Sequence, residues 1–273
     1  MKIAVLYNLV EQATEDIPLP NNWDEILQRF RNSYVQHPAG IEHDLYLCAS
    51  GAPLSSRSRH LFAELKYRTL NYIGKGWDIG AYQHCAGRLL EYDLVFFMNS
   101  QAFVVTDEWL SPFAGAYASY GPGIYGASSS FEVSPHIRTS AFAASPQLLL
   151  RYPLKVKSRY DACVFEHSPT NFAQWAIGRK YPVQVVMCSG TYPLMDSRRG
   201  ADIFRRGSQK DLIINDRHTL LYELATGTER KRLEQLADGK IPVDFTYQNR
   251  LKRWIARSRP LQLTWRTLSN LKH

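Results

Sequence analysis

The first hundred residues of this chain alternate between strand-like and helix-like segments, and no other feature limits its fold as much. Residues 2–7 are apolar and end at Asn8, and the continuous apolar run DLVFFMNS at 93–100 is typical of a buried central strand. Between these two, the pattern predicts strands at 43–48 and 70–73, and helices that open at Asn22, within 55–65 and at 79–90. Crossovers of this length favour parallel pairing, so we predict an α/β sheet with helices on both faces.

The second half is less regular. Strands are expected at 123–130, 136–144 and 183–187, and helices at 168–178, from Asp216 to Gly227 and from Thr228 to Gly239. Between Ser189 and Asp211 the sequence shows little periodicity, over a length that compact domains seldom leave without structure. We therefore predict a mobile active-site loop there.

The length of 273 residues, with 45% hydrophobic and 21% charged residues, predicts an ordinary globular protein, one large domain with a short appendage. The formal net charge of +8 is unevenly distributed. From Phe245 onward there is no acidic residue, and the basic residues are Arg250, Lys252, Arg253, Arg257, Arg259, Arg266 and Lys272. The body is thus nearly neutral, and the tail carries the basicity.

The cysteines and the hydropathy of the sequence indicate the cellular compartment in which the protein is expected. Cys48, Cys85, Cys163 and Cys188 are scattered without a CxxC pair, which favours neither a disulfide framework nor a zinc site. Asn8 interrupts the apolar start, no small-residue cleavage site follows, and the other apolar runs are far shorter than the ~20 residues that span a bilayer. We expect no export signal and no membrane span, and hence a cytoplasmic protein.

The stretch GKGWDIG places glycines at 74, 76 and 80, with Asp78 among them, at the start of an expected helix. Glycines let a backbone approach a ligand, N–H groups at a helix N-terminus suit phosphate, and a carboxylate accepts hydrogen bonds from ribose. The alternative is structural: Asp78 would cap the helix and Gly76 would supply a turn. Familiar signatures are absent from the sequence, namely GxGxxG after the first strand, a P-loop, HExxH and GxSxG.

The next expected strand ends in FFMNSQ. Asn99, Ser100 and Gln101 therefore lie at the carboxyl end of a central strand, where open α/β sheets bind ligands. The collinear order of YN after the first strand, GKGWDIGAY, YDLVFFMNS and GASSS…HIRTSAF resembles bacterial polysaccharide glycosyltransferases of the GT-A fold, especially the rhamnan-synthesis protein F-like group. This resemblance covers roughly residues 1–187.

The resemblance implies a GT-A-like (Rossmann-like) fold, which we assign to a domain at 1–244 with a nucleotide-binding half at 1–101 and an acceptor half at 102–244. The residues that follow predict a helical, basic and amphipathic tail at 245–273. The sheet of the domain would be mixed, mainly parallel and flanked by helices. By the same resemblance Tyr7 and Asn8 would contact the nucleotide base, Asp78 the ribose or donor sugar, and Asn99, Ser100 and Gln101 would replace a DxD motif. Lys75, Gly76 and Gly80 would complete the donor site.

A DxD motif holds Mg²⁺ or Mn²⁺ against the donor diphosphate, because hard cations prefer oxygen ligands and need negative partners. NSQ offers amide and hydroxyl oxygens without charge, so the sequence does not decide whether Mg²⁺ or Mn²⁺ binds as a cofactor. Without a metal, cationic side chains must offset the charge of the leaving diphosphate. The candidates are Lys75 and the arginines of the predicted loop, Arg198, Arg199, Arg205 and Arg206, for which a solvated loop is the alternative.

An inverting transfer needs a general base for the acceptor hydroxyl, and a carboxylate is the usual choice. Glu166 lies just before an expected short helix, in a segment similar to the acceptor site of these transferases. Its alternative is a surface carboxylate that favours the helix N-terminus. Asp107 and Glu108, in TDEWL, are competing candidates or helix-capping residues.

His136 and Arg138 lie two apart in an expected strand, so they would point to the same face. By the resemblance this strand lines the sugar site, where Arg138 would meet donor phosphate or acceptor hydroxyls. His136 would contact the sugar or serve as a structural histidine. His218 is either the late metal-binding histidine of some GT-A enzymes or a residue of a helix's first turn.

The tail places Leu251, Trp254 and Ile255 on one helical face among basic residues. Such a segment can lie on an anionic membrane surface, and the alternative is a terminal helix packed on the domain with solvated charges.

Together these features predict an enzyme, a hexosyltransferase-type glycosyltransferase. It would move a sugar from a nucleotide-sugar donor, with inversion, to a lipid-linked bacterial surface glycan such as the O-antigen of lipopolysaccharide or a capsule, at the cytoplasmic face of the plasma membrane. The alternative is a catalytically silent, transferase-like subunit that binds glycan or organises polysaccharide assembly. A basic nucleic-acid-binding protein is a third hypothesis, although no recognition fold accompanies the tail.

Overall fold

The computed structural model describes residues 1–12 and 22–242. The chain divides into two units, Met1–Lys240 and Ile241–His273. The amphipathic tail predicted at 245–273 lies outside the described residues, so both its helix and its membrane surface stay predictions. None of the described helices is both long and apolar enough to cross a bilayer.

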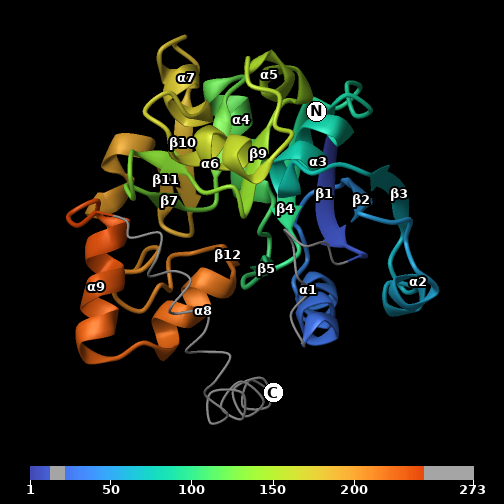
Figure 1. Ribbon diagram of the computed structural model, residues 1–273, viewed down its shortest axis with the longest axis horizontal. Coiled ribbons are helices and arrows are strands. Elements are labelled where there is room, and N and C mark those ends of the chain that lie inside the picture. Colours follow the sequence, from blue (N-terminus) through green and yellow to red (C-terminus); the bar gives the residue numbers. More distant parts are fainter. Residues whose placement is uncertain (13–21, 243–273) are drawn as a thin grey trace. The chain divides into compact units, whose positions relative to one another are not determined.

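The centre of the first unit is a mixed sheet with the strand order β11-β10-β6-β9-β4-β1-β2-β3 (Figure 1). Its strands are β1 (Ile3–Val10), β2 (Asp44–Ser50), β3 (Tyr67–Tyr72), β4 (Leu94–Asn99), β6 (Ile124–Gly126), β9 (Ala141–Ala144), β10 (Val183–Met187) and β11 (Gly190–Pro193). Parallel pairs join β1 to β2 and β4, β2 to β3, and β6 to β10. Strand β9 runs antiparallel between β4 and β6, and β11 runs antiparallel to β10. The predicted α/β class with a mixed, mainly parallel sheet is confirmed.

Helices complete the layers, together with two short ribbons. The helices are α1 (Trp23–Gln36), α2 (Ser56–Leu61), α3 (Trp77–Ala86), α4 (Ser111–Tyr120), α5 (Pro146–Arg151), α6 (Arg159–His167), α7 (Phe172–Ile177), α8 (Arg217–Leu224) and α9 (Gly227–Ala237), with a 3-10 helix η1 at Leu194–Arg199. The ribbons pair β5 (Phe103–Val104) with β12 (Ile214–Asn215), and β7 (Ser129–Ser130) with β8 (His136–Ile137).

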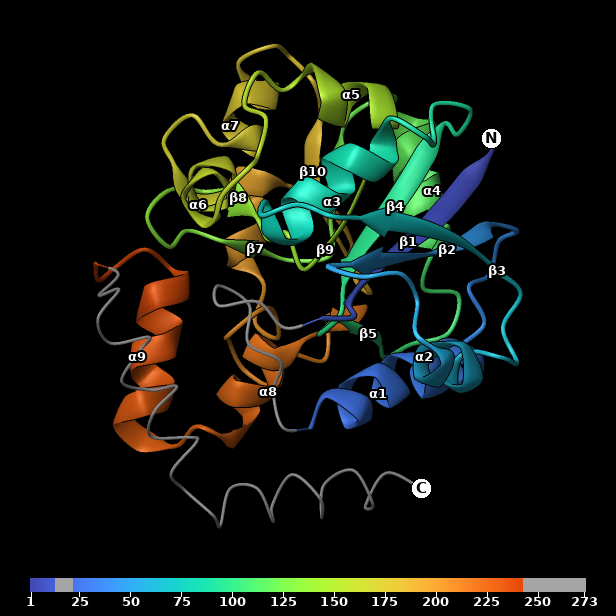
Figure 2. The same ribbon diagram turned by 45° about the vertical axis from the view of Figure 1, so that its right-hand side comes forward.

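The two faces of the sheet bury different helices, because side chains alternate along each strand. On one face Leu6 and Phe97 pack with α3, α5, α6 and α7. On the other face Val5 and Phe96 pack with α1, α4 and the end of α2. Figure 2 shows α3 lying across β4 and β1, with α1 beyond the other side of these strands. Helices α1 to α7 are thus held against the sheet by apolar layers, and the polar ends of the strands are left at the sheet edge.

The second half differs from the sequence prediction in its strands. Each of the strands predicted at 123–130 and 136–144 is divided between the large sheet and the β7–β8 ribbon. Alternation of apolar and polar residues does not reveal where a chain passes from one sheet to another. The division matters because it places His136 in the ribbon and Ala141 in the large sheet.

The helix predicted at 168–178 is also different. Helix α7 begins at Phe172, where the side chain of Asn171 accepts a 3.0 Å hydrogen bond from the backbone N–H of Gln174. The preceding residues form a separate helix, α6, which the side chain of Ser158 caps. Glu166 therefore lies in the last turn of α6, and the predicted position just before a helix was wrong.

The loop predicted at 189–211 is not irregular, since it contains β11 and η1 and buries Ile203, Phe204 and Arg205. Helix α8 follows Asp216 as predicted, but it ends at Leu224. Gly227, expected to end that helix, instead opens α9 with a φ of +52°.

Candidate functional site

Asp78 lies in the first turn of α3, against the carboxyl ends of β1 and β4. The side-chain amide of Asn8 donates a 2.6 Å hydrogen bond to Asp78 Oδ1, and the Asn99 side chain also donates to this carboxylate. Asn8 and Asn99 are direct partners in the parallel β1–β4 register. Ser50, at the end of β2, donates a 2.6 Å hydrogen bond to Asn8 Oδ1 and so fixes the orientation of that amide. The turn that carries Asp78 and the end of β4 therefore lie side by side at one edge of the sheet.

The environment of Asp78 is electrostatically unusual. Burial raises the pKa of Asp78 to about 6, against the hydrogen bonds from Asn8 and Asn99, which favour the charged form. The negative charge of Glu166 adds to the rise, so the two carboxylates lie close enough to interact. Because the partners of Asp78 are side chains of neighbouring strands, the carboxylate does more than cap its helix.

At two glycines of the turn, other atoms of the protein lie where a Cβ would stand. A Cβ at Gly76 would collide with the backbone oxygen of Val156, and a Cβ at Gly80 would collide with the hydroxyl of Tyr72. Gly76 also donates a 3.1 Å hydrogen bond to this hydroxyl. Lys75 beside it is exposed. Close packing within the chain therefore explains these glycines, and their contact with a donor stays a prediction.

Tyr7 has a different environment from the one its predicted role requires. It is fully buried on the opposite face of the sheet, where its ring stacks on Phe30 with centroids 3.5 Å apart. Its hydroxyl donates a 2.8 Å hydrogen bond to the backbone oxygen of Ser100. Asn99 Oδ1 accepts a 3.1 Å hydrogen bond from the backbone N–H of Gln101. The structure thus gives Tyr7 a place in the core and directs Asn99 towards Asp78.

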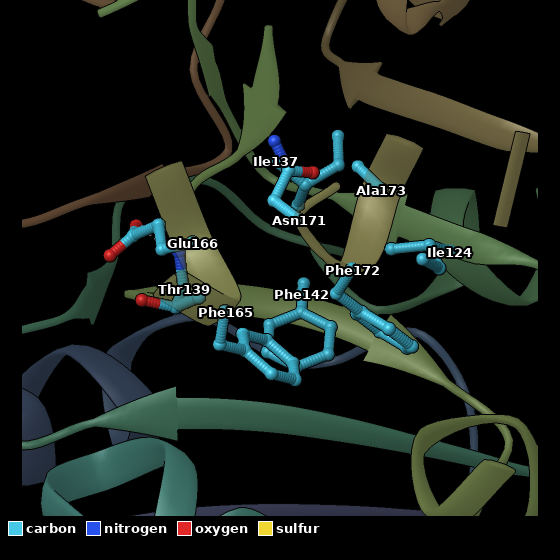
Figure 3. Close-up of a pocket in the computed structure, with 9 residues that line it drawn as sticks. All are labelled: Ile124, Ile137, Thr139, Phe142, Phe165, Glu166, Asn171, Phe172 and Ala173. Atoms are coloured by element: carbon cyan, nitrogen blue, oxygen red, sulfur yellow. Dashed lines mark hydrogen bonds between the residues drawn. The ribbon is translucent and has the colours of Figure 1, made fainter. Parts of the chain in front are cut away.

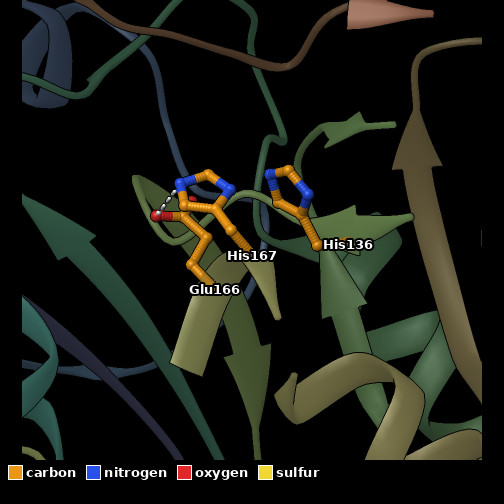
Figure 4. A group of neighbouring side chains, drawn as sticks. All are labelled: His136, Glu166 and His167. Carbon is orange, nitrogen blue, oxygen red and sulfur yellow. Dashed lines mark ion pairs between the residues drawn. The ribbon is translucent and has the colours of Figure 1, made fainter. Parts of the chain in front are cut away.

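Glu166 forms a compact group with two histidines (Figure 4). Its Oε1 accepts a 2.9 Å hydrogen bond from the backbone N–H of Thr139, and its Oε2 lies 3.6 Å from His167 Nε2. The ring of His136, on β8, stands nearly perpendicular to that of His167, with centroids 4.6 Å apart. Within the part of the chain that the structure describes, these three side chains are spaced closely enough to bind one metal ion together.

Burial shifts the pKa values of His136 and Glu166 in opposite directions. It lowers the pKa of His136 to about 4, so this imidazole is neutral at pH 7. Burial alone would raise the pKa of Glu166, but His167, His136 and the Thr139 N–H together hold it below its usual value. Asp78 and Glu166 are therefore two neighbouring carboxylates whose pKa values are displaced in opposite directions, a pattern typical of acid–base sites.

A small cavity lies beside Glu166 (Figure 3). Its lining residues are Ile124, Ile137, Thr139, Phe142, Phe165, Glu166, Asn171, Phe172 and Ala173. Its volume of about 10 Å³ is close to the space that a single water molecule needs. In Figure 3 the carboxylate of Glu166 points away from the rings of Phe142 and Phe172. The cavity is thus too small to hold a sugar.

Arg138 makes a buried ion pair with Asp216, with Nη1 and Oδ2 2.7 Å apart, and its guanidinium lies 3.8 Å from the centre of the Phe204 ring. Burial opposes the charge of Asp216, but Arg138 and the side chain of Ser140 hold the pKa of this carboxyl well below its usual range. The backbone oxygen of Ser140 accepts a 3.0 Å hydrogen bond from the N–H of Asn99. A continuous polar network therefore joins Arg138 to Asn99 and, through the Asn99 side chain, to Asp78.

The arginines of the predicted loop are partnered within the protein. Arg205 is buried, with Nη2 3.2 Å from His218 Nδ1 and Nη1 3.7 Å from Glu132 Oε2. Burial lowers the pKa of Arg205 to about 10, so it stays charged at neutral pH. The remaining pairs are Arg198 and Arg206 with Asp238, and Arg199 with Asp196. The alternative of a solvated loop does not fit these ion pairs, and a contact of the arginines with the diphosphate stays a prediction.

Asp107 is not brought to this site. Its side chain is 70% exposed and lies 2.8 Å from His37 Nδ1, at the end of α1. Helix α1 covers the opposite face of the sheet from α3 and α6. Glu108 follows with a φ of +54° and donates its N–H to the backbone oxygen of Pro38. A capping or connecting role fits these two residues better than catalysis.

Three contributors were not found from the sequence as site residues: His167, Ser50 and Asp216. His167 directly follows Glu166 in the sequence, and this adjacency could have indicated that it belongs to the site. Asp216 was predicted only as the start of α8. Its role as the partner of Arg138 depends on a long-range contact that no local pattern indicates.

The chain matches no protein-family model and no curated protein. Among solved structures it is similar to a mannosyltransferase from Pyrobaculum calidifontis in complex with GDP-Man and Mn²⁺, with 10% identity and a TM-score of 0.41 over 56% of this chain and 46% of that one. It is also similar to glucosyl-3-phosphoglycerate synthase from Mycobacterium tuberculosis, solved with Mn²⁺, UDP and phosphoglyceric acid, with 14% identity and a TM-score of 0.42 over 59% of this chain and 61% of that one.

A third similar structure is mouse xyloside xylosyltransferase 1, with 7% identity and a TM-score of 0.44 over 69% of this chain and 86% of that one. This chain spans less than two thirds of the length of the mannosyltransferase and of the synthase. With TM-scores below 0.5, these likenesses decide neither the activity nor the ligands of this chain.

Proposed function

We propose that this chain is a glycosyltransferase that uses a nucleotide-sugar donor. The observation that carries the proposal is the position of Asp78, held by Asn8 and Asn99 at the carboxyl ends of two parallel strands with Glu166 nearby. Ligands bind at this edge of open α/β sheets. The motifs that resemble polysaccharide glycosyltransferases fall on these same residues.

In this mechanism Asp78 accepts hydrogen bonds from hydroxyls of the donor. The acceptor hydroxyl attacks the anomeric carbon, the bond from that carbon to the diphosphate oxygen breaks, and the nucleoside diphosphate leaves with the electron pair. Glu166 takes the proton of the attacking hydroxyl, through the oxygen that Thr139 does not occupy. The transfer would invert the configuration of the sugar.

A divalent cation at the DxD position does not fit these residues. The backbone oxygen of Ser100 already accepts from Tyr7, and Asn99 Oδ1 accepts from Gln101. Asp78 supplies a single carboxylate, which two amides engage. Mg²⁺ and Mn²⁺ bind preferentially to sets of oxygen ligands that include free carboxylates. We infer that the exposed Lys75 offsets the charge of the diphosphate instead.

The identity of the acceptor is a further part of the proposal. The resemblance favours a lipid-linked bacterial surface glycan, such as O-antigen or capsule, and a hexosyl donor. The basic residues from Arg250 to Lys272 would hold the enzyme at the anionic inner face of the plasma membrane. The uncharged NSQ supports a second candidate, a transferase-like subunit that binds donor or glycan without catalysis.

Calorimetric titration tests the donor site. We expect UDP-, GDP- or dTDP-linked sugars to bind the wild-type chain equally well with and without Mn²⁺, and Asp78→Ala to weaken binding at least about tenfold. Asp24→Asn is the control, because this carboxylate lies on the surface and pairs with Arg57. If no nucleotide sugar binds, the proposal fails. Donor binding without release of the nucleoside diphosphate, in the presence of glycan acceptors, would favour the silent subunit.

A further inference from the structure

We propose that His136, Glu166 and His167 form a binding site for a divalent transition-metal ion of the zinc class. Each residue offers one ligand atom, and these atoms all lie within 4.8 Å of one another. The residues come from two elements, β8 and the last turn of α6, so the fold rather than a local motif brings them together (Figure 4). This site does not depend on the proposed sugar transfer.

The orientation of His136 suits a metal ligand. Its Nδ1 lies 2.8 Å from the backbone oxygen of Ser134 and can donate its hydrogen there, which leaves Nε2 with a free lone pair. Histidines that bind metals usually have this arrangement, because the second hydrogen bond fixes the tautomer and the plane of the ring. The imidazole is 2% exposed, so its orientation is set by packing.

Glu166 and His167 both have atoms that are free to bind a ligand. Thr139 engages only Oε1 of Glu166, and Oε2 lies 3.6 Å from His167 Nε2. The other ring nitrogen of His167, Nδ1, is buried without a hydrogen-bond partner. A buried polar atom without a partner is costly, and it is one indication of an absent ion or water.

The chemistry of the ligand set selects the ion. Two imidazoles and a carboxylate suit Zn²⁺ and its neighbours, whereas Mg²⁺ and Ca²⁺ prefer sets made of oxygen. Zinc bonds of about 2.0–2.1 Å place tetrahedral ligands roughly 3.3 Å apart, so small side-chain rotations would close the present spacing. Three protein ligands leave a fourth position for water. The side chains of Glu166 and His167 are 20% and 28% exposed, which gives an ion a route from solvent.

An ion at this site would occupy the oxygen of Glu166 that the proposed mechanism assigns to the acceptor proton. In a transferase the two states would exclude each other, and zinc would inhibit transfer. Metal binding itself can be measured without any sugar.

The test uses the full chain after removal of metals by a chelator, in a Cys163→Ser/Cys188→Ser background, because these two thiols are exposed and could bind zinc themselves. Zn²⁺ is titrated by calorimetry, and Co²⁺ is titrated by its visible absorption, which reports tetrahedral coordination. We expect one ion per chain. His167→Gln and Glu166→Gln should each weaken binding by about tenfold or more, at least as much as the loss of an outer partner does.

His37→Gln serves as the control, since this histidine pairs with Asp107 away from the site. His136→Gln is a third variant, and circular dichroism checks that it folds; His167→Gln keeps the test decisive if it does not. Binding that neither His167→Gln nor Glu166→Gln weakens would overturn the proposal, and so would binding no stronger than that of Mg²⁺. Donor titrations report separately on the proposed transferase, so failure of one proposal is distinguishable from failure of the other.

Discussion

The side chain of Asn8 donates a 2.6 Å hydrogen bond to Asp78, although the two residues are 70 positions apart. The contact joins the end of β1 to the start of α3. It exists because the β1–β4 pairing and the packing of α3 on the same face bring polar residues to one edge of the sheet. A carboxylate at this point is held in place before any ligand arrives.

The raised pKa of Asp78 predicts a dependence of stability on pH. With a pKa of about 6 in the folded protein and an ordinary value near 4 when unfolded, the folded state retains its proton longer. The contribution of this group is therefore fully present below about pH 4 and is lost as the pH rises towards 6, by about 1–3 kcal/mol. Asp78→Asn should lack this loss. Urea unfolding between pH 4 and 8 measures it, with Asp24→Asn as control, and parallel curves for wild type and Asp78→Asn would refute the assignment.

Glu166→Gln should separate binding from chemistry. The amide preserves the shape of the side chain but cannot take a proton, so transfer should fall by about 10²–10⁴-fold while the affinity for the donor changes little. The comparison is Glu64→Gln, an exposed carboxylate paired with Arg31. Equal transfer rates in Glu166→Gln and wild type would remove Glu166 from the mechanism.

The Arg138–Asp216 pair predicts an effect on stability. Arg138→Leu leaves a buried carboxylate without its partner, so the free energy of unfolding should fall by about 3–5 kcal/mol. Arg199→Leu removes a pair in which the arginine side chain is 84% exposed, and should cost less than about 1 kcal/mol. Chemical denaturation of both variants checks the difference. Similar losses in the two would show that burial does not decide the strength of these pairs.

The packing of the glycine turn can be tested in the same way. Gly76→Ala places a methyl group against the backbone of Val156, and we expect it to lower the free energy of unfolding by about 1–3 kcal/mol. Gly115→Ala, inside α4, meets no atom within 4 Å and should be neutral or stabilising by up to about 1 kcal/mol. If Gly76→Ala is harmless to stability but abolishes donor binding, the glycine serves the ligand rather than the packing.

The sequence predicted the central strands and the Asp78 turn because both are local signals. A continuous apolar run such as that of β4 fits a buried strand, and polar residues at its carboxyl end point to one sheet edge. The sequence did not predict the meeting of His136 with His167, or of Arg138 with Asp216. These contacts depend on where the segment around β8 meets the end of α6 and the start of α8. It also did not indicate that Arg198 and Arg206 pair with Asp238, which lies far along the chain.

Strand β9 runs antiparallel to its neighbours, and this direction brings a further stretch of chain to the sheet edge that holds Asp78. In the register of β4 with β9, Met98 lies opposite Ala141, so the residues that precede β9 arrive where β4 ends. Thr139 and Ser140 thereby reach the edge that the parallel strands reach only with their last residues. One inverted strand thus lets a second stretch of chain, which comes from the opposite direction, contribute groups to the same edge without a longer loop.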